Sequence, residues 1–66
     1  MSYENFKMHV NSLISRVDGE KPTVTFRHVD GRHYANFSDG TVIIGNSVAH
    51  NVMVKWGSGH AATAAI

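Results

Sequence analysis

Residues 26–34, "FRHVDGRHY", hold the side chains of this 66-residue chain that are best suited to chemistry. A basic residue and a histidine stand on each side of a central Val29-Asp30-Gly31. Cations bind phosphate, paired imidazoles bind zinc or copper, and an Asp-Gly pair forms a tight hairpin turn. The stretch therefore has three interpretations: a nucleic-acid contact, a metal site or the tip of a hairpin.

The two histidines of this stretch, His28 and His33, face each other if Asp30-Gly31 forms a two-residue turn. Their Cβ atoms would then lie about 5 Å apart, close enough to share a metal ion. A stable zinc site needs a third and usually a fourth ligand, and no carboxylate is placed by sequence to supply one. His50 or His60 could fold in, but nothing requires it. We favour a histidine pair that closes the end of the core, and we predict no metal and no cofactor.

Catalytic groups are scarce. Ser58 and His60 combine a nucleophile with a base, but their segment is rich in glycine and offers no oxyanion hole. The triplets "GNS" at 45–47 and "GSG" at 57–59 do not match the spacing of a phosphate-binding loop. The sequence predicts that the protein is not an enzyme and has no small-molecule substrate.

The composition limits the class of protein. The formal net charge is +1, with 6 Lys+Arg against 5 Asp+Glu, too balanced for a general DNA binder. The absence of cysteine excludes disulfides and thiolate zinc sites. No apolar run could span a bilayer, and the polar Ser2, Glu4 and Asn5 stand where a secretory signal would have basic residues. We expect a soluble, cytoplasmic protein that does not bind membranes.

A chain this short has a thin stability margin. Ordering it costs ~100 kcal/mol at about 1.5 kcal/mol per residue. Burial of about 4,000 Å² of apolar surface would be needed to offset that cost, nearly all that such a chain can supply. Because disulfides are excluded, self-association is the commonest remaining source of stability, and we expect a homodimer.

The chemistry-bearing residues must be positioned by a helix and several strands. Residues 3–17 are predicted to form a helix, with Ser2 as N-cap, Arg16 in the last turn and Gly19 after its end. Its apolar residues recur at helical spacing: Tyr3, Phe6, Val10, Leu13, Ile14 and Val17.

Alternating apolar residues predict strands at 23–29, 32–37, 41–44 and 51–56. Asp30-Gly31 and Asp39-Gly40 separate the first three of these strands. The tail, 57–66, is expected to be flexible unless it docks, since six alanine-rich residues cannot hold a helix alone. The predicted fold class is α+β: one domain over 1–66, an N-terminal α-helix packed on an antiparallel β-meander of three to four strands.

If both Asp-Gly pairs form two-residue turns, the register assigns each strand residue to a face. The residues predicted beneath the helix are Val24, Phe26, Ala35, Phe37, Val42 and Ile44. The opposite face then carries Thr23, Thr25, Arg27, Tyr34, Asn36, Thr41 and Ile43, with Arg27 opposite Tyr34 in a pair suited to stacking.

That second face is the predicted contact surface. A cluster of Tyr34, Ile43 and Met53 would be too apolar for a lone monomer of this size. We predict a small non-enzymatic binding protein, a regulator or inhibitor that contacts another protein through its sheet face or edge; such chains are common among mobile genetic elements. The alternative is a nucleic-acid-binding regulator. The predicted contact residues are Arg27, Arg32, Tyr34, Ile43, Met53 and Lys55.

The order of helix, three strands and "GSGHAATAAI" is loosely similar to that of a double-stranded RNA-binding domain. In that family the last helix opens after glycines and is rich in alanine. The family places a lysine pair at the start of that helix, where this chain has His60-Ala61-Ala62. Since the phosphate-binding lysines are missing, we do not assign the chain to this family.

Overall fold

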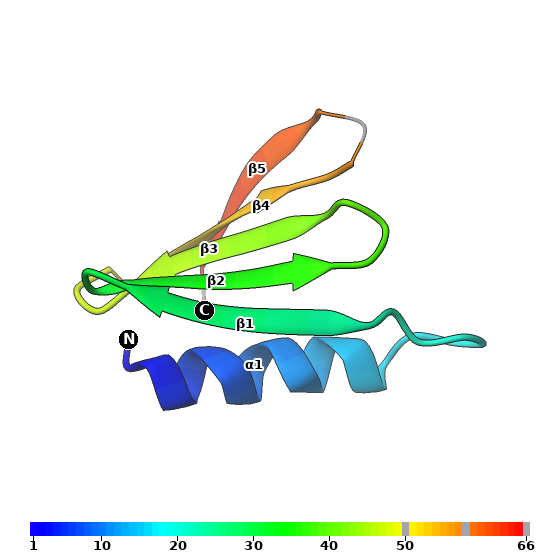
Figure 1. Ribbon diagram of the computed structural model, residues 1–66, viewed down its shortest axis with the longest axis horizontal. Coiled ribbons are helices and arrows are strands. Elements are labelled where there is room, and N and C mark those ends of the chain that lie inside the picture. Colours follow the sequence, from blue (N-terminus) through cyan, green and yellow to red (C-terminus); the bar gives the residue numbers. More distant parts are fainter. Residues whose placement is uncertain (50, 58, 66) are drawn as a thin grey trace.

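The computed structural model describes residues 1–49, 51–57 and 59–65 of the chain. An N-terminal helix, α1, packs on a five-stranded antiparallel sheet in which the strands follow one another in chain order (Figure 1). The α+β meander predicted from sequence is therefore confirmed, with one strand more than expected. The elements are α1 (Tyr3–Ser15), β1 (Val24–Val29), β2 (Arg32–Phe37), β3 (Val42–Asn46), β4 (Asn51–Lys55) and β5 (Ala61–Ala65).

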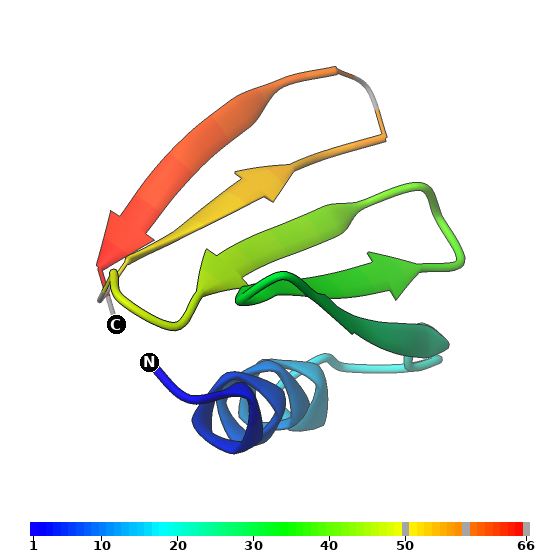
Figure 2. The ribbon, with the colours of Figure 1, turned by 60° about the vertical axis from the view of Figure 1, so that its left-hand side comes forward.

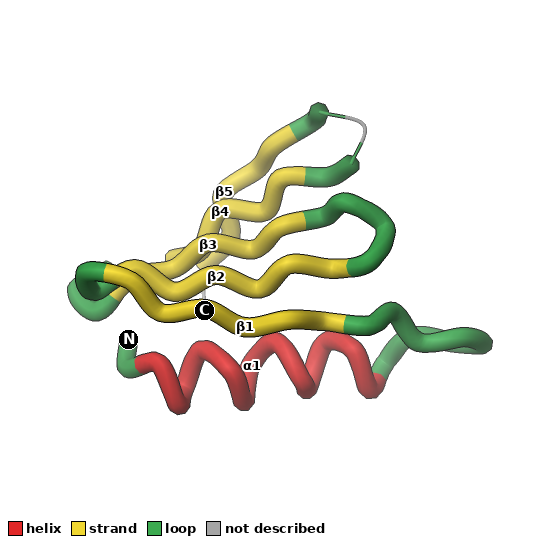
Figure 3. The backbone as a smooth tube through the Cα atoms, viewed as in Figure 1, coloured by secondary structure: helices red, strands yellow, loops and turns green. Residues whose placement is uncertain are grey.

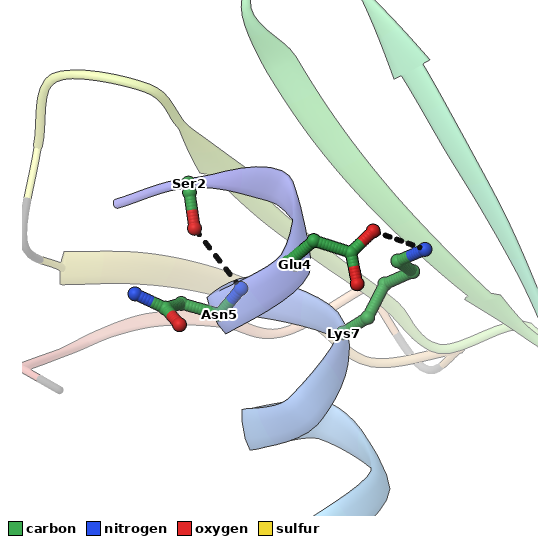
Figure 4. Close-up of polar contacts among 4 residues, drawn as sticks. All are labelled: Ser2, Glu4, Asn5 and Lys7. Atoms are coloured by element: carbon green, nitrogen blue, oxygen red, sulfur yellow. Dashed lines mark hydrogen bonds and ion pairs between the residues drawn. The ribbon is translucent and has the colours of Figure 1, made fainter.

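The start of α1 follows the prediction. Ser2 is the N-cap, and its Oγ accepts a hydrogen bond from the backbone N–H of Asn5 at 3.1 Å (Figure 4). Glu4 and Lys7, one turn apart, form an ion pair of 3.0 Å on the helix surface (Figure 4). These local contacts fix where the helix begins.

The helix ends at Ser15, so the predicted end at Val17 is two residues too late. Beyond this end, the Nζ of Lys21 donates to the carbonyl oxygens of Ile14, Ser15 and Val17 at 3.0–3.3 Å. These contacts bring positive charge to the carbonyl end of the helix. Arg16, predicted in the last turn, is the C-cap.

The core lies between α1 and the face of the sheet that we call the inner face. Phe6 and Val10 from α1 are fully buried and pack with residues of β2, β3 and β4. The other buried apolar residues of the core are Ala35, Ile43 and Val52.

The first hairpin has the predicted turn. Val29 pairs with Arg32, and the two residues between them, Asp30 and Gly31, have φ of 49° and 75°. Positive φ at both central positions defines a type I′ turn. The predicted pairing of β1 with β2 is correct throughout, including His28 opposite His33.

The second hairpin differs from the prediction by one residue. The N–H of Phe37 donates to the carbonyl of Thr41 at 2.8 Å, so the loop holds three residues, and Gly40 has a φ of 91°. A three-residue loop with glycine in the left-handed region is the next most common hairpin connection. Ala35 consequently faces Ile43 where Ile44 was predicted.

This shift exchanges the two faces of β3, because side chains alternate along a strand. Thr41 and Ile43, predicted to be outside, lie on the inner face. Val42 and Ile44, predicted to be in the core, lie on the outer face, the side of the sheet away from α1. The placement of Ile43 on the outer face was therefore wrong.

The tail contributes β5, which pairs with β4 from Lys55↔Ala61 to Asn51↔Ala65. The tail was expected to be flexible unless it docks, and residues Ala61–Ala65 do dock, as a strand on β4. Residues that resemble the start of a final helix in double-stranded RNA-binding domains form a strand in this chain.

The helix covers only part of the sheet. In both ribbon views α1 lies beside β1, and β5 is the strand farthest from it (Figures 1 and 2). The tube in Figure 3 shows the same arrangement, with α1 on the β1 side of the sheet. Within the described residues, no helix is long and apolar enough to cross a membrane.

Candidate interaction surface

Five of the six predicted contact residues lie on the outer face. Strand alternation places Arg27, Arg32, Tyr34, Met53 and Lys55 there, and all except the half-buried Tyr34 are exposed. The sixth residue, Ile43, is 6% exposed and belongs to the core.

The register joins three of the outer-face residues into one row across the sheet. Tyr34 faces Ile44 on the next strand, and Ile44 faces Met53 on the strand after it. Directly opposed side chains on neighbouring strands lie within contact range. We call Tyr34, Ile44 and Met53 the central row. Met53 is 48% exposed, so the row presents apolar surface to solvent.

Sequence reasoning missed Ile44, and the cause is local. In residues 41–44, "TVII", each of the two alternating sets contains an isoleucine, so hydrophobicity does not show reliably which side faces the core. The glycine at position 45 is a sequence feature that could have indicated which face of this strand lies beneath the helix. It lies on the inner face against the ring of Phe6, where a Cβ would lie 2.9 Å from Cδ1 of that ring.

Cations surround the central row. Arg27 faces Tyr34 at the β1 end, Arg32 faces Asn46, and Lys55 faces Val42. The acidic residues all lie elsewhere: Glu4 on the helix, Asp18 and Glu20 in the loop after it, and Asp30 and Asp39 in hairpin turns. The outer strand positions thus carry positive charge alone.

A shallow cavity of about 230 Å³ adjoins the central row. Ile44, Met53 and Thr63 form part of its wall, together with Arg32 and Asn46. The cavity mixes apolar side chains with a cation and amide groups. It is suited to receive a side chain from another molecule.

A second group of chemistry-bearing residues lies on the inner face at the start of α1. The rings of His28 and His33 are 4.9 Å apart between centroids, and Tyr3 stacks on both at 4.9 and 5.5 Å. His33 is fully buried, and its Nε2 donates to the carbonyl oxygen of Met1 at 2.9 Å. This cluster closes one end of the core.

The same cluster contains His28 and His33, the two histidines considered as metal ligands from the sequence. The ring planes of these two histidines are tilted by 45° to each other. In the described part of the chain, no three His, Cys, Asp or Glu side chains gather at one point. His50 and Ser58, named as alternative ligand and nucleophile, fall outside the described residues.

Beyond the end of α1, the inner face has an apolar groove of about 300 Å³. Leu13 from the helix, Phe37 and Val54 from the sheet, and Trp56 after β4 contribute to its lining. Trp56 is 44% exposed, so it does not close the core as a buried anchor would.

No family model matches this sequence, and neither the curated proteins nor the solved structures contain a match to it. The function of the chain is therefore inferred from its own geometry.

Proposed function

We propose that this chain is a small non-enzymatic binding protein, a regulator or inhibitor, that contacts another protein through the outer face of its sheet. The central row carries the proposal. Tyr34, Ile44 and Met53 form a continuous apolar strip on a face that α1 does not cover. Tyrosine, methionine and arginine are the residues enriched at the centre of protein interfaces.

The charges around the strip define the partner. Three cations and no carboxylates occupy the outer strand positions described above, so the complementary surface has an apolar centre bordered by carboxylates. Charge complementarity of this kind speeds association and excludes wrong partners. The cavity beside Ile44 and Met53 receives one side chain of that partner.

The matched substitutions Met53→Glu and Met8→Glu test the proposal. Met53 lies in the central row, whereas Met8 is 67% exposed on α1. A buried carboxylate at position 53 should weaken partner binding by about 30-fold, the equivalent of a hot-spot loss of ~2 kcal/mol. Met8→Glu should bind as the original chain does.

The measurement is quantitative affinity capture with chemical cross-linking, using the purified chain and both variants as bait. Cross-links from the partner should map to Lys55 on the outer face. Loss of the same partner from both variants, or its retention by both, would refute the proposal. Circular dichroism establishes that each variant is folded.

The three outer-face cations also favour a second candidate, a nucleic-acid-binding regulator that uses Arg27, Arg32, Tyr34 and Lys55. Cations meet phosphates and an aromatic ring stacks on a base in such surfaces. Binding of a single-stranded oligonucleotide through three phosphate contacts should weaken about 20-fold between about 50 and 200 mM salt. Fluorescence polarisation that detects no binding even at low salt would remove this candidate.

A further inference from the structure

The last strand of the sheet, β5, has an open edge. It pairs with β4 at five consecutive positions, and the sheet order ends with it. An uninterrupted edge strand presents a regular row of N–H and C=O groups on its free side. Such a row is the template on which another strand adds.

The two edges of the sheet differ in how well they are protected. At one edge, β1 carries the cation Arg27 and lies beside α1 in both ribbon views (Figures 1 and 2). At the other edge, β5 consists of alanine and threonine alone and lies farthest from the helix (Figure 2). Charge, proline, a bulge and a covering helix are the usual protections of an edge. Of these, β5 has none.

The sequence of β5 reads the same in both directions, Ala-Ala-Thr-Ala-Ala. Two copies paired antiparallel about Thr63 would therefore place identical residues opposite each other: threonine on threonine, with alanine on alanine on either side. Threonine pairs across strands are favourable, and alanine offers no steric obstacle. The strand is thus complementary to itself.

Alanine is also a poor strand former. The side chains of Ala61, Ala62 and Thr63 are exposed, so burial contributes little to holding β5 in place. A strand of this composition gains most from hydrogen bonding on both of its edges. A single chain supplies such bonds on only one of them, through β4.

We propose that a second copy of this chain occupies the open edge, with β5 pairing antiparallel to β5 about a twofold axis through Thr63. The product is a closed dimer with one continuous sheet, because both copies use the same edge and β1 is left at each end. The contact is made by backbone groups of β5 and is separate from the outer-face contact proposed above.

The dimer extends the central row. Met53 faces Thr63 within one chain. In the dimer, Thr63 of the first copy faces Thr63 of the second copy, which in turn faces Met53 of that copy. The central row thus runs across both sheets. Each end of the enlarged outer face then carries the Arg27 of one copy. The dimer would present to its partner a surface twice as long as that of one chain.

Sedimentation equilibrium on the chain and on two matched variants tests the dimer. The chain should sediment at twice its mass of 7.2 kDa. Thr63→Lys sets two like charges face to face on the axis and should weaken the dimer about tenfold or more. Thr25→Lys makes the same change at an exposed position of β1, the opposite edge strand, and should leave the dimer intact.

A cysteine substitution provides a second, covalent measurement. The chain has no cysteine, so Thr63→Cys carries a single thiol on the proposed axis. Directly opposed residues of an antiparallel pair approach the Cβ spacing of a disulfide. Mild oxidation should cross-link most of the Thr63→Cys protein, whereas Thr25→Cys should remain a single chain.

A chain that sediments as a monomer, or a dimer that Thr63→Lys leaves unchanged, would overturn this inference. So would equal cross-linking of the two cysteine variants. Met53→Glu separates the two proposals, because it should weaken partner binding about 30-fold while the β5 dimer persists. A dimer lost in Met53→Glu and retained in Thr63→Lys would show outer-face association and exclude edge pairing.

Discussion

Gly45 is the residue on which the packing of helix against sheet depends most directly. A Cβ at this position would lie 2.9 Å from Cδ1 and 3.1 Å from Cε1 of the Phe6 ring. The ring cannot move away easily, since Phe6 is fully buried and meets Phe26 edge to face at 6.4 Å between centroids. Glycine therefore allows the helix to approach the sheet.

Gly45→Ala should lower the free energy of unfolding by about 1–2 kcal/mol. Overpacking costs about 1–3 kcal/mol, and the reduced entropy of the unfolded chain returns less than about 1 kcal/mol. Urea unfolding of the variant measures the difference. A free energy of unfolding equal to that of the original chain would show that the Phe6 ring moves away from the new methyl group at little cost.

The double variant Gly45→Ala, Phe6→Leu is the control for this mechanism. Leucine lacks the Cε1 atom and its smaller, branched side chain leaves more room for the new methyl group, so alanine should cost less in that background. The two substitutions should be coupled by about 0.5 kcal/mol or more. Additive effects would mean that Phe6 is not the cause of the destabilisation.

At the scale of elements, the loop between β2 and β3 decides which face each residue of β3 occupies. Asp39 holds this loop, because its Oδ1 accepts a hydrogen bond from the N–H of Thr41 at 2.8 Å. The loop also rests on Gly57, where a Cβ would lie 2.6 Å from the carbonyl oxygen of Asp39. Side-chain and backbone contacts together select the three-residue loop.

The hydrogen bond from Thr41 lowers the pKa of the Asp39 carboxyl below its ordinary value of 3.8. The folded state thus favours the charged form, and the carboxylate stabilises the fold at pH values above 3.8. As the pH falls through the lower, folded-state pKa, the carboxylate is protonated and this stabilisation is lost.

Asp39→Asn should therefore be less stable than the original chain at about pH 6, and the difference should shrink as the pH is lowered below the ordinary carboxyl pKa of 3.8. Asparagine keeps an oxygen that can accept from Thr41, so the comparison isolates the charge. Urea midpoints over this pH range provide the measurement. Asp18→Asn, which removes the same charge from an exposed loop position, is the matched control.

At the scale of the whole molecule, stability should decrease from the helix-covered part of the sheet toward β5. The buried residues lie mainly on α1, β2 and β3, whereas the described side chains of β5 are exposed. Regions with few buried apolar contacts open locally at low free energy. The molecule is thus expected to have a stable half and a labile half.

Amide hydrogen exchange at low protein concentration should show this gradient. The amides of β5 should exchange about 30-fold faster than those of β2, corresponding to an opening free energy lower by ~2 kcal/mol. Thr63→Lys, which is expected to be a monomer, should show the same order. Equal protection of β2 and β5 in that variant would contradict a labile fifth strand.

Local signals in the sequence determined the helix, the first hairpin and the class of the fold. The N-cap Ser2 and the apolar period of residues 3–17 mark α1, and Asp30-Gly31 satisfies a type I′ turn without help from the rest of the chain. Such features depend on backbone preferences within a few residues, so a sequence displays them directly. Most of the outer-face residues followed from the same pattern.

Tertiary contacts decided the register of β3, the burial of Ile43 and the strand at the tail. Asp39-Gly40 fits both a two-residue and a three-residue loop, and each alternating set of "TVII" contains an isoleucine. The three-residue loop is the one that places Gly45 against Phe6 on the inner face. At the tail, pairing with β4 holds alanines in a strand although alanine favours helix. Long-range contacts outweigh weak local preferences there, because those preferences differ by only about 1 kcal/mol.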